Sequence, residues 1–240
     1  MNRLLIATVI CLFLVSPMRA QSDDFGIWTD VNVEKELGNY WELEGGVEFR
    51  SRDKVRKADR WSGNIGASYE LTDWLKTSAG YSLLYDNRHK LNTKGNKYAD
   101  YWSVRHRFNV SLTASKTFGR LSVSLRERWQ YTYRPEKTVM RYYVSSGAED
   151  GEHTFNAKGK NVWRNRLQLK YRINKRWRPY ANAETNVSNG LDKIRYTAGT
   201  EIRLTKQHWL DAKYIYQHVY DDDDEEGNLH VIGIGYTYKF

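Results

Sequence analysis

The sequence predicts an all-β, antiparallel, up-and-down transmembrane β-barrel of ten or twelve strands. Three observations support this fold class. Apolar and polar residues alternate with a period of two in eleven segments of about ten to thirteen residues, the length that a tilted strand needs to cross a bilayer. Short turns and long loops alternate between these segments. Tyr (18) and Trp (9) outnumber Phe (7), as expected for amphipathic rings at membrane interfaces.

Residues 1–20 have the pattern of a cleaved signal peptide. Arg3 supplies the positive region, and Leu4–Val15 is an apolar stretch that is too short to span a membrane as a helix. The only cysteine, Cys11, lies in this segment, with too short an apolar stretch before it for a lipoprotein signal. The barrel domain is therefore expected to cover 21–240, without disulfide bonds or thiolate metal sites.

The predicted strands share one pattern, in which an apolar or aromatic outer face alternates with a small or polar inner face. The outer face of the sixth strand includes one acid, Glu127, between leucine and tryptophan positions. A further strand-like run, Val139–Ser145, lies in the longest loop and is predicted to form a hairpin that extends the wall above the membrane. In chain order the strands are Gly26–Leu37, Trp41–Arg50 (outer face Trp41, Leu43, Val47, Phe49), Arg60–Leu71 (Trp61, Ile65, Tyr69), Leu75–Tyr85 (Leu75, Tyr81, Leu83), Tyr101–Ala114 (Trp102, Phe108, Leu112), Leu121–Tyr133 (Leu121, Leu125, Trp129), Asn161–Ile173 (Trp163, Leu167, Leu169), Trp177–Val187, Ile194–Leu204, Trp209–Tyr220 and Leu229–Phe240.

The strand number stays open because eleven segments conflict with purely antiparallel closure. Single-chain bacterial barrels normally have an even number of strands. Either Gly26–Leu37 is not a wall strand and the barrel has ten strands, or one strand is missed and the barrel has twelve. Seven tryptophans are expected at the two membrane interfaces: Trp41, Trp61, Trp102, Trp129, Trp163, Trp177 and Trp209.

The last strand carries the clearest signal for the compartment. From His230 to Phe240 its outer positions are apolar or aromatic, and the chain ends on an aromatic residue. This pattern resembles the terminal strand of bacterial outer-membrane barrels, which their insertion machinery reads. The resemblance implies an outer-membrane protein that contacts this machinery through Phe240. Its surroundings are then the lipid bilayer and lipopolysaccharide, whose phosphates suit four basic residues of the longest loop: Lys137, Arg141, Lys158 and Lys160.

Several motifs spread over the chain resemble one family. Asp-Phe-Gly-Ile-Trp-Thr at 24–29 and Val-Glu-Lys-Glu-Leu at 33–37 are followed by Glu-Phe-Arg-Ser-Arg-Asp at 48–53 and Trp-Arg-Pro-Tyr at 177–180. With these motifs the chain resembles the bacterial outer-membrane barrels grouped as domain of unknown function 2490, over essentially all of residues 21–240. The resemblance implies the barrel fold and brings no established activity or catalytic residues.

The predicted inner face is strongly charged. Glutamates gather on the first two strands, at Glu34, Glu36, Glu42, Glu44 and Glu48, and basic residues gather on three later strands that follow one another. This predicts either a small channel or binding barrel that favours a small anionic solute, or ion pairs that fill a closed structural or adhesion-type barrel acting through its loops. The candidate anion-contacting residues are Arg105, Arg107, Arg126, Arg128, Arg164, Arg166, Lys170 and Arg172.

A membrane-embedded lipid hydrolase is a third reading, with weaker support. Ser188 lies in a Ser-Asn-Gly context similar to that of outer-membrane phospholipase A, but Asn186 occupies the position of its histidine and an amide cannot act as a general base. A turn explains this segment better. The histidines show no metal-ligand spacing, and the acidic run 221–226 lacks calcium-loop spacing. No cofactor, metal site or nucleic-acid partner is therefore expected, despite the formal charge of +9.

Overall fold

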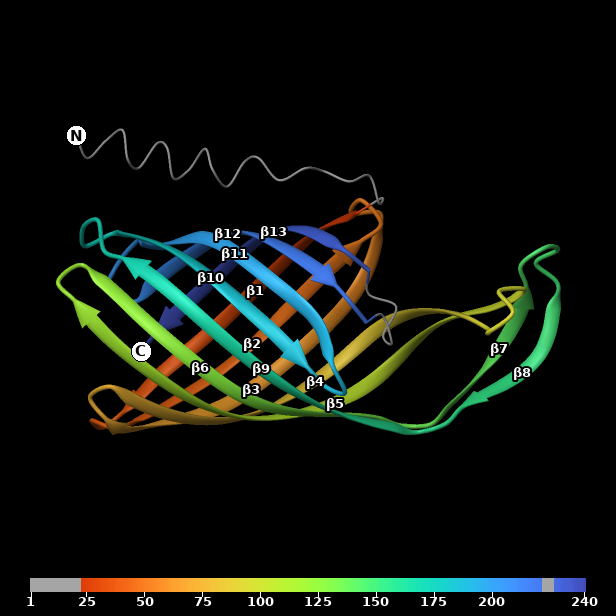
Figure 1. Ribbon diagram of the computed structural model, residues 1–240, viewed down its shortest axis with the longest axis horizontal. Helices are drawn as coiled ribbons and strands as arrows, with labels where there is room; N and C mark the ends of the chain where they lie inside the picture. Colours follow the sequence, from red (N-terminus) through yellow and green to blue (C-terminus); the bar gives the residue numbers. More distant parts are fainter. Residues whose placement is uncertain (1–22, 222–226) are drawn as a thin grey trace.

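The structure is a computed structural model that describes residues 23–221 and 227–240 (Figure 1). Within these two ranges, no helix is long and apolar enough to cross a membrane. The leader predicted at 1–20 and most of the acidic run at 221–226 lie outside the described residues. The strands are β1 (Asp24–Leu37), β2 (Trp41–Arg52), β3 (Lys57–Thr72), β4 (Leu75–Leu91), β5 (Lys97–Phe118), β6 (Leu121–Arg134), β7 (Lys137–Tyr143), β8 (Glu149–Phe155), β9 (Lys158–Tyr171), β10 (Trp177–Val187), β11 (Leu191–Arg203), β12 (His208–Val219) and β13 (Leu229–Lys239).

Eleven of these strands close into a barrel, which confirms the predicted fold class. The order around the wall is β1 to β6, then β9 to β13, and β13 pairs back with β1. All neighbouring wall strands are antiparallel except β1 and β13, which run parallel from the Asp24–Leu229 pair to the Glu34–Lys239 pair.

The expected number of ten or twelve strands is wrong, and the parallel pair explains why. In a barrel closed only by antiparallel pairs, strand directions must alternate all the way round, so the number is even. One parallel pair removes that restriction. β1 is a full wall strand, paired with β2 from Trp28–Arg50 to Leu37–Trp41 and with β13 on its other side.

The two ends of the barrel differ. The turns that join β1 to β2, β3 to β4, β5 to β6, β9 to β10 and β11 to β12 lie at one end together with Phe240, and we call it the turn end. The longer connections and the β7–β8 hairpin lie at the other end, the loop end (Figure 1). In bacterial outer-membrane barrels, short turns face the periplasm and long loops face outward.

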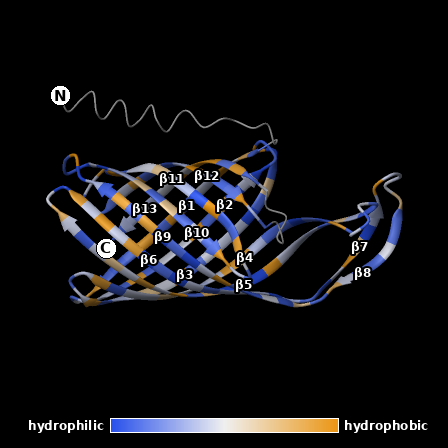
Figure 2. Cartoon of the chain, viewed as in Figure 1, coloured by the Kyte–Doolittle hydropathy of each residue, from blue (hydrophilic) through white to orange (hydrophobic). Residues whose placement is uncertain are grey.

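Hydrophilic and hydrophobic residues alternate along the wall strands (Figure 2). Ile65 is 67% exposed and Val47 is 60% exposed although both are large and apolar, whereas the inward Gln217 is 1% exposed. An apolar outer surface around a polar interior is the reverse of a soluble protein, and lipid is the solvent that it suits.

One of the seven tryptophans expected at the interfaces faces the lumen instead. Trp41 and Trp177 are exposed at the turn end of their strands, whereas Trp61 and Trp163 are exposed nearer the loop end. Trp209 is inward because the even-numbered positions of β12 face out. The Arg178 guanidinium lies 4.5 Å from its ring centroid.

A hairpin arm projects from the loop end, as predicted for the run Val139–Ser145 (Figure 1). β7 and β8 form this arm, and β7 also pairs with the start of β5 through Lys97–Tyr143 and Tyr98–Tyr142. Asp150 of the arm accepts hydrogen bonds from Lys97 of β5, at 2.5 Å, and from Arg141 of β7, at 2.8 Å. One carboxylate thus joins the arm to the outer end of β5.

We expect Asp150→Asn to loosen the arm without unfolding the barrel. The hydrogen bond from Lys97 lowers the pKa of the Asp150 carboxyl from 3.8 to about 2. Because the folded pKa is depressed, the stabilising contribution is complete above about pH 4 and is lost as the pH falls toward 2. Limited proteolysis across residues 135–157 should therefore speed up in the variant at pH 7, and in the wild type only below about pH 4. Equal cleavage of both proteins at pH 7 would show that Asp150 does not anchor the arm.

Candidate functional site

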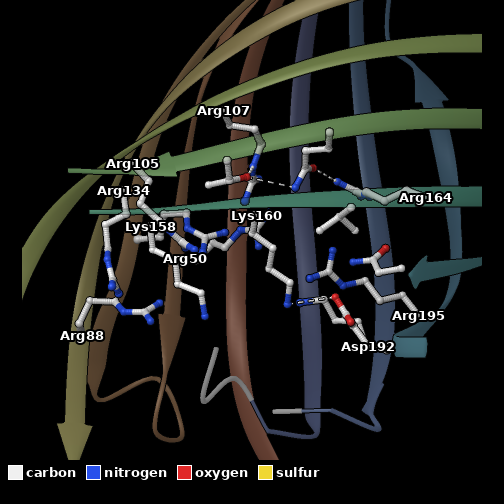
Figure 3. Close-up of a pocket in the computed structure, with 16 residues that line it drawn as sticks. Arg50, Arg88, Arg105, Arg107, Arg134, Lys158, Lys160, Arg164, Asp192 and Arg195 are labelled. Atoms are coloured by element: carbon white, nitrogen blue, oxygen red, sulfur yellow. Dashed lines mark hydrogen bonds and ion pairs between the residues drawn. The ribbon is translucent and has the colours of Figure 1, made fainter. Parts of the chain in front are cut away.

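The loop half of the lumen holds a hollow whose lining is mostly basic (Figure 3). Eleven of its sixteen lining residues are Arg or Lys, and one, Asp192, is acidic. We call this hollow the basic vestibule. Its basic residues are Arg50, Arg60, Arg88, Arg105, Arg107, Arg134, Lys158, Lys160, Arg164, Lys193 and Arg195.

A buried carboxylate holds two of these arginines in place. Asp86 of β4 is 3% exposed and lies between Arg60 of β3 and Arg105 of β5. It accepts hydrogen bonds from Arg60 Nε and, at 2.6 Å, from Arg105 Nε. The Nη2 group of Arg105 is buried without a hydrogen-bond partner. Asp86 thus fixes both guanidinium groups and leaves one donor of Arg105 unsatisfied.

A second buried carboxylate lies deeper in the lumen, on the opposite wall. Glu184 of β10 accepts hydrogen bonds from Arg164 Nη2 at 2.5 Å and from Arg126 Nη2 at 2.6 Å. Arg164 also donates to Gln130 Oε1 at 3.0 Å, which holds its guanidinium at the floor of the vestibule (Figure 3). Arg164 therefore connects the vestibule to the charged network below it.

Three vestibule cations form no ion pair within the described part of the chain. Arg107 donates only to the Thr132 hydroxyl, at 3.4 Å. Arg134 makes one long bond to the Asn156 carbonyl, and its Nε is buried without a partner. Lys158 forms no hydrogen bond or ion pair. These side chains give the vestibule positive charge that its carboxylates do not compensate.

An aromatic ring supports the opposite wall of the vestibule. Trp28 of β1 is 7% exposed and packs with Ile215 and Val231. The guanidinium of Arg50 lies 3.8 Å from its ring centroid, and that of Arg195 lies 5.4 Å away. Arg50 also donates two hydrogen bonds to the Glu48 carboxylate, at 2.8 and 2.9 Å, so the ring and the carboxylate together hold its guanidinium.

The sequence profile of DUF2490, a family of unknown function, matches residues 25–228. The chain belongs to the DUF2490 family. No curated protein matches it.

Solved structures similar to this DUF2490 protein are outer-membrane β-barrels. The translocator domain of the autotransporter NalP from Neisseria meningitidis has a TM-score of 0.58 at 12% identity, over 82% of this chain and 80% of that one. The β domain of the Bordetella autotransporter BrkA has a TM-score of 0.51 at 17% identity, over 85% and 82%. The NanC porin has a TM-score of 0.47 at 13% identity, over 86% and 93%. At these identities the likeness shows the fold alone.

The eight candidate residues of the DUF2490 lumen fall into three groups. Arg105, Arg107 and Arg164 line the vestibule. Lower in the lumen, Arg126, Arg128 and Arg166 point inward from β6 and β9, and Lys170 pairs with Glu201 at 2.5 Å near the turn end. The eighth residue, Arg172, directly follows the end of β9 and is exposed, and its amide donates a hydrogen bond to the Arg120 carbonyl.

Most residues of the vestibule were not among the candidates. Several of them lie beyond the ends of the predicted strands, because β4, β6, β9 and β11 extend further at the loop end than the sequence predicts. The missed basic residues lie near the loop ends of six strands, and no single segment of the sequence contains more than a few of them. Two properties of the sequence together could have identified these residues: their parity, which places them on the inner face of a strand, and their distance along the strand from the turn end. Missed residues are Arg50, Arg60, Arg88, Arg134, Lys158, Lys160, Lys193 and Arg195.

Lys158 and Lys160 therefore line the vestibule, and their expected contact with lipopolysaccharide phosphates stays a prediction. Lys160 pairs with Asp192 at 3.1 Å. The expected acidic region on β1 and β2 lies mainly at the turn end, where Glu42 pairs with Lys76 at 2.9 Å and Glu34 pairs with Lys239. The turn end of the lumen is thus lined by carboxylates that pair with lysines, whereas the loop end is lined mainly by cations.

The residues weighed for hydrolysis do not form a catalytic pair in the structure. Ser188 donates to Asp192 at 2.5 Å and lies in a turn, as expected, with its amide bonded to the Gly190 carbonyl. His106 bonds the Tyr81 hydroxyl on the outer face. Across residues 23–221 and 227–240, no group of three or more His, Cys, Asp or Glu residues has the geometry of a metal site.

Proposed function

We propose that this DUF2490 barrel lies in the outer membrane and admits small anionic solutes through the basic vestibule. The observation that carries the proposal is the charge of the lining, with eleven basic residues and one acidic residue. A cleft lined by one sign of charge concentrates ions of the opposite sign and raises their rate of entry.

The guanidinium groups of the lining favour oxyanions, such as carboxylates and phosphates, over halide ions. Guanidinium groups donate paired N–H bonds that match a carboxylate or phosphate. Arg105 Nη2 and Arg134 Nε are buried donors without partners, and each such donor costs about 1–3 kcal/mol if it stays unsatisfied. An oxyanion in the vestibule would satisfy them. Below the vestibule, Arg126 and Arg164 bind Glu184, and these arginines form a second group of cations along the path of an anion toward the turn end.

The test is conductance of the refolded barrel in a planar lipid bilayer under a salt gradient. We expect discrete openings with a reversal potential that shows preference for anions. The double variant Arg107→Gln with Lys158→Gln should reduce the anion-to-cation permeability ratio roughly twofold to tenfold, because these cations have no carboxylate partner whose charge would be released.

A matched control removes the same charge at the turn end. Arg120→Gln with Arg172→Gln changes two exposed cations that lie outside the vestibule, so the permeability ratio should stay within twofold of the wild type. Cation preference in the wild type, or equal effects of the two double variants, would contradict the proposal.

A second candidate is a closed barrel that binds anions without conducting them. It is favoured by a network in the lower lumen, where Lys213 bonds Asp211 at 2.9 Å and Asp30 at 3.4 Å, and the Tyr180 hydroxyl donates to Asp211 at 2.9 Å. A folded barrel that conducts no ions but binds inorganic phosphate in calorimetry, with affinity that falls as salt rises, would support this candidate over the channel.

A further inference from the structure

One acidic side chain lies on the apolar outer face of the barrel. Glu127 is on β6, where its register partners Leu112 of β5 and Asn165 of β9 face outward with it. Its neighbours along the same face are Leu125, which is 47% exposed, and Trp129. Glu127 is itself exposed and forms no hydrogen bond or ion pair within the described part of the chain.

The depth of Glu127 makes this exposure costly. Five residues of β6 lie between Glu127 and Leu121 at the turn end, and Trp129 and Trp163 follow on its loop side. It therefore lies inside the apolar band rather than at its rim. Ionisable residues at such a depth are rare, need a partner and mark functional surfaces.

Two further polar groups continue the row on the same face. Asn165 is the register partner of Glu127, and Thr185 of β10 is the register partner of Asn165. The Asn165 amide donates weakly to the Thr185 hydroxyl, at 3.5 Å. A carboxyl acceptor and an amide donor thus lie one strand apart on a surface that is otherwise built from leucine and tryptophan.

From this placement we infer that the β6–β9 face binds a second copy of the same barrel. A two-fold axis along the membrane normal, between β6 and β9, brings Glu127 of each copy to Asn165 of the other. Both copies then pair acceptor with donor, and an amide N–H can bond the carboxyl in either protonation state. Leu125 and Leu167, which are register partners, would pack beside these bonds. Polar side chains between apolar neighbours hold membrane segments together in this way.

The first test is cross-linking of single-cysteine variants in native membranes. Leu167→Cys lies on the proposed face, and Val31→Cys is the matched control. Val31 is also outward and half exposed, but it lies on β1, five strands from β6 in one direction and five from β9 in the other. We expect a disulfide-linked dimer of Leu167→Cys well above the level of Val31→Cys and of the unmodified chain. Equal yields from the two variants would overturn the inference.

The second test separates the polar pair from general apolar contact. In sedimentation equilibrium in mild detergent, Glu127→Leu and Asn165→Leu should each weaken dimerisation roughly tenfold, because each removes two symmetric hydrogen bonds. Glu127→Gln, which keeps an acceptor, should dimerise nearly as well as the wild type. Since leucine suits a lipid-facing position, these variants should fold. A wild type that stays monomeric, or a Glu127→Leu dimer as strong as the wild type, would overturn the inference.

Discussion

Asp86→Asn is expected to lower the free energy of unfolding by about 3–5 kcal/mol, because it leaves two buried guanidinium groups without their shared counter-ion. The Asp86 side chain is 4% exposed, and those of Arg60 and Arg105 are 7% and 8% exposed, so water cannot replace the lost charge without rearrangement. Urea unfolding of the barrel in lipid vesicles, followed by tryptophan fluorescence, would measure the change.

A carboxylate on the barrel rim provides the control for this prediction. Asp53 pairs with Lys57 at 3.7 Å, and both side chains are about half exposed. Asp53→Asn should therefore change stability by less than about 1 kcal/mol. If Asp86→Asn costs no more than Asp53→Asn, then water or ions already solvate the Asp86 site, and the vestibule is wetter than its burial indicates.

Asp86→Asn should lower the stability of the barrel without lowering its preference for anions. Losing Asp86 raises the positive charge of the vestibule, so anion preference should be kept or increased in molecules that stay folded. The variant would then keep or increase the anion-to-cation permeability ratio while its free energy of unfolding falls. This separates the role of Asp86 as a support for Arg105 from the role of the cations that an anion would meet.

The wall strands could be predicted because their signal is local. A period of two in apolar character depends only on the two solvents, lipid outside and water inside, that each strand separates. The inward phase of Arg105, Arg126 and Arg164 and the outward phase of Glu127 follow from this alternation alone. The same alternation places Trp209 in the lumen, because the even-numbered positions of β12 face outward, so its expected place in the aromatic girdle was wrong.

Closure of the barrel could not be predicted from local patterns. The choice between ten, eleven and twelve strands depends on whether β1 pairs with β13, and these strands are some 200 residues apart in sequence. Nothing in the alternation of 26–37 distinguishes a strand that pairs parallel from one that pairs antiparallel. The even count expected for bacterial barrels was therefore a poor guide here.

The composition of the site was only partly predictable for a related reason. The inward phase identifies which cations reach the lumen, but not which of them meet a carboxylate. That depends on the register between strands, as in Arg60, Asp86 and Arg105, which come from three neighbouring strands. These partners determine the role of each cation. An arginine that is paired with a carboxylate stabilises the wall, whereas Arg107 or Lys158 can bind a solute.

Leu167→Arg is expected to destabilise the folded barrel by about 2–4 kcal/mol, the cost of a cation that faces lipid near the middle of the apolar band. Leu167 is 51% exposed on β9, between Asn165 and Leu169 on the same face. Tyr171→Arg is the matched control, since Tyr171 is 45% exposed on the same strand and face but at its turn end. The cost there should fall to about 0–1 kcal/mol, because a long cation near the interface reaches water.

The difference between these two variants tests the membrane placement itself. Urea unfolding in vesicles measures both variants. A solvent that changes with depth predicts unequal costs for an arginine introduced at these two similarly exposed positions. In water, both arginines would cost little. Equal, small changes would therefore show that the apolar face around Leu167 is not covered by lipid. Water would then solvate the Glu127 carboxylate, and the argument that Glu127 needs a partner in a second copy would no longer hold.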